Sequence, residues 1–122
     1  MSWHFQNDRP IYLQMEDKIK LRIISGETAA GEKLPAVRDM AVEAGVNPNT
    51  VQRAYAELER EGLVFSQRTS GRFVTEDKGV IDKMKDEMAA KQIELFFKSM
   101  AAIGFDADEV LKLISEKAGR ES

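Results

Sequence analysis

Hydrophobic side chains recur every three or four positions along three stretches of the first half of the chain, which predicts three amphipathic helices. These helices are expected at about residues 10–25, 35–44 and 47–61. The third has the clearest start, because Asn47 can accept a hydrogen bond from a free backbone amide and Pro48 takes a position that needs no donor.

The third predicted helix has one apolar and one polar face. Its inward positions, spaced three and four apart, are Val51, Ala54, Tyr55 and Leu58. The positions that point elsewhere are Asn49, Gln52, Arg53, Ala56 and Arg60. The outward face therefore offers amide and guanidinium groups to a partner and has no large apolar anchor.

A β-hairpin is expected after the third helix. Two short β-prone runs at 63–65 and 73–75 flank the polar, glycine-containing segment 67–72. This order of helices and strands, with the hairpin as a wing, is the plan of a winged helix.

The spacing of Ala41, Gly45 and Val51 supports the same plan. Two crossing helices need a small residue where their backbones approach, a residue that tolerates positive φ in the turn, and an apolar residue that fills the crossing. We therefore expect a mainly α fold (an α+β winged helix) with a winged helix-turn-helix DNA-binding domain at residues 1–76.

The second half of the chain is expected to be helical. An apolar stripe from 77 to 103 predicts one long helix, and a capping box of Asp106 and Glu109 starts a last helix. A module this small cannot cover the stripe, so residues 77–122 are expected to dimerise. The expected dimerisation residues are Ile81, Met84, Met88, Phe96 and Met100.

Composition narrows the chemistry further. The chain has no cysteine, which excludes a disulfide scaffold, a thiolate metal cluster and a cysteine nucleophile. Its one histidine, His4, cannot form an imidazole metal site alone. We expect no catalytic residues, no metal and no cofactor. The chain has no signal peptide and no long apolar run, which predicts a cytoplasmic protein without a membrane partner. A net charge of -3 means that any nucleic-acid binding must be local and geometric.

Three segments carry a family resemblance: PIYLQM at 10–15, GEKLPAVRDMA at 31–41 and NPNTVQRAYAELEREGL at 47–63. They resemble the DNA-binding domain of GntR-type bacterial transcription regulators, and the short tail is similar to that of the YtrA subfamily, whose tail mediates dimerisation. The resemblance implies a homodimeric transcription factor, commonly a repressor and often of transporter operons. The chain departs from the family at Ala36, where Ser is usual, and at the wing tip, which lacks an extra glycine.

Carried over residue by residue, the resemblance implies DNA contacts by Arg38, Asn47, Asn49, Thr50, Arg53 and Gly71. Gln52 on the third helix and Arg68 and Arg72 at the wing tip complete the expected set. Helix N-termini favour phosphate, Asn and Gln can pair with adenine, and Arg can pair with guanine. A twofold dimer then implies a pseudo-palindromic, double-stranded operator.

Other interpretations remain open at this stage. Asn47 and Thr50 could serve only as helix caps. The alternative function is a winged-helix module that binds a protein, although the third helix lacks the apolar anchor such a face needs. Asp39 and Glu43 lie one helical turn apart without a metal-ligand or nucleophile partner, which favours a solvated face over an enzyme site. A small-molecule effector is left open.

Overall fold

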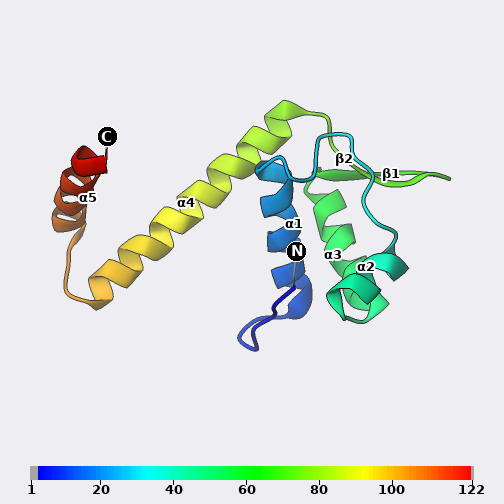
Figure 1. The fold of residues 1–122 in the computed structure, drawn as a ribbon, viewed down its shortest axis with the longest axis horizontal. Helices are drawn as coiled ribbons and strands as arrows, with labels where there is room; N and C mark the ends of the chain where they lie inside the picture. The colour runs from blue at the N-terminus through cyan, green and yellow to red at the C-terminus, as the bar shows by residue number, and fades with distance from the viewer. Residues whose placement is uncertain (1–2, 122) are drawn as a thin grey trace. The chain divides into compact units, whose positions relative to one another are not determined.

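The computed structural model describes residues 3–121, and within them the expected elements are present as a winged helix-turn-helix followed by two helices (Figure 1). In chain order the elements are α1 (Ile11–Ile24), α2 (Val37–Ala44), α3 (Pro48–Arg60), β1 (Val64–Gln67), β2 (Gly71–Val74), α4 (Lys78–Ala102) and α5 (Ala107–Glu121). The mainly helical fold class is confirmed, and the element boundaries differ from the expected ones by only a few residues.

The chain forms two compact units, which meet between Met84 and Lys85. The first unit therefore contains the winged helix and the first turns of α4, and it ends beyond the boundary expected near residue 76. The assignment of residues 1–76 to DNA binding and 77–122 to dimerisation remains a prediction.

Helix α3 is the centre of the first unit, where it packs against α1, α2 and β1. Its four expected inward residues are all buried. The other buried apolar side chains of this core include Met15, Ile19, Ile23, Leu34, Met40, Ala41, Leu63, Val64 and Val74. Ile11, in the first turn of α1, is 41% exposed and lies beside an open hollow.

The turn between α2 and α3 has the geometry that the sequence predicts. Gly45 caps α2 at φ 69°, and the Val46 amide donates to the Ala41 carbonyl at 3.0 Å. Asn47 caps α3, and its Oδ1 accepts from the Asn49 amide at 2.8 Å. Since Val51 is fully buried, it fills the helix crossing as expected.

The wing is wider than a hairpin. β1 and β2 pair antiparallel, and the segment 31–34 lies along the other edge of β2. There the Leu34 amide donates to the Arg72 carbonyl at 2.8 Å, and the Val74 amide donates to the Glu32 carbonyl at 2.9 Å. The chain that leads into α2 is thus fastened to the wing.

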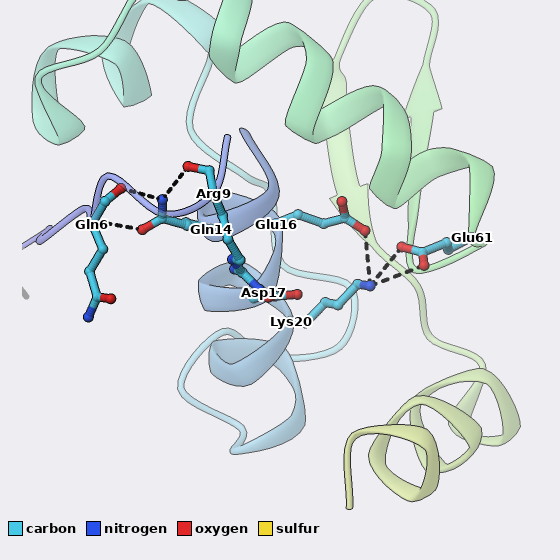
Figure 2. A network of polar contacts seen from close by, with 7 residues as sticks. All are labelled: Gln6, Arg9, Gln14, Glu16, Asp17, Lys20 and Glu61. Carbon is cyan, nitrogen blue, oxygen red and sulfur yellow. Dashed lines mark hydrogen bonds and ion pairs between the residues drawn. The ribbon is translucent and has the colours of Figure 1, made fainter. Parts of the chain in front are cut away.

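A buried polar cluster joins α1 to the end of α3 (Figure 2). The Nζ of Lys20 lies 2.9 Å from Glu16 Oε1 and 3.0 Å from Glu61 Oε2. Glu16 is 5% exposed, and this burial raises its pKa to about 7, although Lys20 acts in the opposite direction.

Figure 2 also shows Gln14, which exchanges hydrogen bonds of 2.8 Å with the Gln6 backbone and so holds the segment before α1 against that helix.

In the second unit, the predicted capping box starts α5. The Glu109 amide donates to Asp106 Oδ1 at 2.9 Å, and the Asp106 amide donates to Glu109 Oε1 at 3.0 Å. Val110, which follows the box, is buried. Within residues 3–121, no helix combines the length and the apolar character needed to cross a membrane.

Candidate nucleic-acid interface

The outward face of α3 is polar and open. Asn49, Gln52 and Arg53 are exposed, whereas the opposite face of the helix lies in the core. In the first turn of α3, Pro48 has no amide hydrogen, the Asn49 amide donates to Asn47 Oδ1, and the Thr50 amide donates to the Asn47 carbonyl. A capped helix with this face can enter a DNA major groove with its N-terminus first.

Arg53 is held over an aromatic ring. Its guanidinium carbon lies 3.9 Å from the centroid of the Tyr12 ring, close enough for a cation–π interaction between α3 and the first turn of α1. The two side chains border an open hollow of about 360 Å³, which is also lined by Ile11, Asn49 and Thr50. Sequence reasoning missed Tyr12, because only the crossing of α1 and α3 brings it beside Arg53.

The two residues that could be helix caps behave differently. Asn47 uses its side-chain oxygen to cap α3, as its position before Pro48 predicts. Thr50 is half-buried and lines the hollow beside Tyr12 and Arg53. A role of either residue toward DNA is compatible with these positions and stays a prediction.

Arg38 is exposed in the first turn of α2. It has no ion-pair partner among the side chains that the structure describes, those of residues 3–119, so its full charge is available to an anion. Ala36, at the cap of α2, makes no side-chain hydrogen bond to the helix, which agrees with the absence of the usual hydroxyl there.

The wing residues are not equivalent. Arg68 is exposed in the turn at the tip. Arg72, however, forms an ion pair with Glu59 on α3, and its guanidinium carbon lies 5.4 Å from the centroid of the Tyr55 ring. This ion pair lowers the pKa of Glu59. Gly71 has φ +106°, a backbone conformation that residues other than glycine rarely adopt.

Arg60 pairs with a neighbour on its own helix. Its guanidinium lies 2.6 Å from Glu57 Oε2, one helical turn away. No group of three or more potential metal-ligating side chains gathers anywhere in the described part of the chain.

The predicted dimerisation residues are exposed to different degrees. Met84 is buried, so its side chain is not open to a second copy. Ile81, Met88 and Met100 are half-buried, and Phe96 is 43% exposed. Several apolar residues of the second unit are more exposed than the predicted ones or equally so: Ile93, Leu95, Ile103, Leu111 and Ile114.

Comparison with known proteins places this interface in a family. Residues 11–74 match the model of bacterial regulatory proteins of the gntR family. The chain is 42% identical to the uncharacterized HTH-type transcriptional regulator YhcF of Bacillus subtilis, over 92% of this chain and 93% of that protein. It is 32% identical to the HTH-type transcriptional repressor YtrA of the same organism, over 91% of this chain and 86% of that protein.

Solved structures agree with the sequence matches. A GntR family transcriptional regulator from Listeria monocytogenes superposes with a TM-score of 0.82 and 35% identity, and covers 92% of this chain and 98% of its own. The DNA-binding domain of AraR in complex with operator ORX1 superposes with a TM-score of 0.56 and 26% identity, over 62% of this chain and 99% of that one. With a polar recognition face, a helix-turn-helix and a wing in place, the chain belongs to the GntR family of DNA-binding transcription regulators, with YtrA-like relatives along nearly its whole length.

Proposed function

We propose that this protein is a homodimeric repressor that binds a pseudo-palindromic operator, and that the operator controls a transporter operon. The relative YtrA is named a transcriptional repressor, and it aligns with this chain over both the winged helix and the tail. A regulator of bacterial operators acts on the chromosome, so we place its activity in the cytoplasm.

The observation that carries this proposal is the outward face of α3. Asn49, Gln52 and Arg53 lie exposed on a helix whose other face is locked into the core, and Arg53 is already ordered by Tyr12. Asparagine and glutamine can pair with adenine, and arginine can pair with guanine, in the major groove. We therefore assign base readout to these three residues.

We assign backbone contacts to residues around this face. Arg38 in the first turn of α2 and Arg68 at the wing tip are exposed cations without an ion-pair partner in the described chain. Asn47 and Thr50 lie at the start of α3, where the positive end of the helix dipole favours a phosphate. Such contacts fix the register of the protein on the duplex without reading its sequence.

Dimerisation is proposed through the tail. In the second unit, Ile93 and Phe96 on α4 and Ile103 directly after the helix are 55%, 43% and 69% exposed. An apolar hollow of about 350 Å³, lined in part by Phe97 and Phe105, lies where α4 ends and α5 begins. Contact with a second copy would remove these apolar surfaces from water, and twofold symmetry would give the two recognition helices equivalent half-sites.

Selection of genomic fragments with the purified protein tests the proposal. We expect a recurrent inverted repeat upstream of transporter genes, and fluorescence anisotropy should show tighter binding to it than to a scrambled duplex. Equal, weak binding to both duplexes would refute the assignment and favour the protein-binding alternative. Sedimentation at micromolar concentration should give a dimer, and a monomer would refute both the dimer and the inverted repeat.

A further inference from the structure

Lys33 lies beside the wing, on the segment that leads into α2. It pairs with Phe73 of β2 in an antiparallel bridge. Directly opposed residues of neighbouring strands project from the same face of a sheet, and successive residues alternate between faces. Lys33 therefore shares a face with Phe73 and lies on the face opposite Arg72.

The side chain of Lys33 leans from this bridge toward the wing tip. A Cβ placed on Gly71 would lie 3.0 Å from Cε of Lys33 and 3.7 Å from its Nζ. The aliphatic stem thus crosses the backbone of Gly71, and the ammonium group lies at the end of the hairpin that carries the turn 68–70. The glycine both adopts a positive φ and leaves the space that the lysine occupies.

The charges on the two faces of the wing differ. On the α3 side, Glu59 accepts hydrogen bonds from Arg72 and from the Ser66 hydroxyl, so the guanidinium is already neutralised. Drawing Arg72 toward DNA would leave Glu59 with a broken ion pair next to the phosphates. Lys33 is exposed and has no ion-pair partner among the described side chains of residues 3–119. The carboxylate of its neighbour Glu32 accepts from the Ala29 amide.

We propose that Lys33, and not Arg72, supplies the cation with which the wing contacts a DNA phosphate near its tip, and that Arg72 instead fastens the wing to α3. The inference rests on the proposed function, because it assumes that the wing meets the duplex beside the groove that α3 enters. It adds a phosphate-binding residue that the sequence pattern did not single out and removes Arg72 from the DNA-contacting set.

The salt dependence of DNA affinity tests this assignment. Each phosphate contact contributes about 0.9 to the slope of log Kobs against log salt, so losing one contact in each copy of the proposed dimer lowers the slope by about 1.8 and reduces the affinity loss between about 50 and about 200 mM salt by roughly 12-fold. We expect Lys33→Gln to lower the slope by this amount on the selected operator and on a scrambled duplex alike. Lys33→Arg should restore the slope. Arg72→Gln should leave it unchanged and lower the melting temperature.

Two controls separate the outcomes. Lys117→Gln removes the same charge from an exposed position on α5 and should leave the slope at its wild-type value. A constant inactive fraction of Arg72→Gln shifts log Kobs but not its slope, so partial unfolding does not imitate a lost contact. A wild-type slope for Lys33→Gln, a reduced slope for Arg72→Gln, or an equal reduction for Lys117→Gln overturns the inference. Failure of the wild-type chain to prefer the operator overturns the proposed function instead.

Discussion

Glu16→Gln should abolish a pH dependence of stability that the buried cluster of Glu16, Lys20 and Glu61 imposes on the first unit. Burial raises the pKa of Glu16 from 4.5 to about 7. Between these values the folded protein keeps a proton that the unfolded chain releases, so the folded state binds more protons and stability falls as pH rises. The stabilisation is complete below the unfolded value and is lost as pH passes through 7.

The magnitude follows from the same two values. A change from 4.5 to about 7 corresponds to at most roughly 3–4 kcal/mol of unfolding free energy. Glutamine keeps the shape of the neutral carboxyl and has no proton to lose, so the variant should hold a nearly constant stability across this range. Glu61 and Lys20 do not produce the effect. The pKa of Glu61 is lowered, so its contribution changes only below its ordinary value of 4.5, and the pKa of Lys20 is raised, so its contribution changes only above 10.5.

Urea unfolding followed by tryptophan fluorescence measures this difference. Trp3 is the single tryptophan and stacks against Arg22 of α1, with its ring centroid 4.7 Å from the guanidinium carbon, so its emission reports on the first unit. We expect the urea concentration at the midpoint of wild-type unfolding to decrease as the pH is raised from about 5 to about 8. Asp17→Asn, a change at a more exposed carboxylate of the same helix, should preserve this fall. Parallel curves for wild type and Glu16→Gln would refute the reasoning.

Four further predictions concern DNA binding and assembly. Arg53→Ala should cost roughly 1–3 kcal/mol at one operator base pair and relax the preference there, as measured by anisotropy with single-base operator variants. Tyr12→Ala should weaken operator binding by about 0.5–1 kcal/mol in the wild-type background and have no further effect when Arg53 is already Ala; additive losses would contradict a positioning role. Arg38→Ala should weaken binding to all duplexes and flatten the salt dependence, and unchanged binding to a scrambled duplex would oppose this. Charged residues in place of Met88 and Phe96 should give a monomer on sedimentation, because unpaired charge would enter the proposed interface, whereas a persistent dimer would place that interface elsewhere.

Local signals explain why so much of the fold could be predicted from the sequence. The core face of α3 follows from helical periodicity alone, and the Asn47-Pro48 start and the Asp106 capping box depend on groups only a few residues apart. These interactions are encoded within single elements. The family resemblance then supplied the candidate DNA contacts, which no periodicity could provide.

What sequence reasoning missed depends on contacts between distant segments. The pairing of 31–34 with β2 consists of backbone hydrogen bonds, which leave little trace in side-chain pattern. Arg72 looked like a free wing cation because its partner Glu59 lies on another element. Met84 shares the helical stripe of the tail, yet it belongs to the first unit, and periodicity does not tell which unit covers a stripe.

A series of contacts runs from α3 to the segment before α2, on to β2 of the wing, and back to α3. The Tyr55 hydroxyl on α3 donates to the Pro35 carbonyl at 2.8 Å, the adjoining Leu34 amide donates to Arg72, and the Arg72 side chain returns to Glu59 on α3. Because these contacts begin and end on α3, the wing cannot move relative to α3 without breaking one of them. We therefore expect the spacing within the operator to matter. One base pair inserted between the bases proposed to contact α3 and the phosphates proposed to contact the wing should prevent both contacts from forming at once.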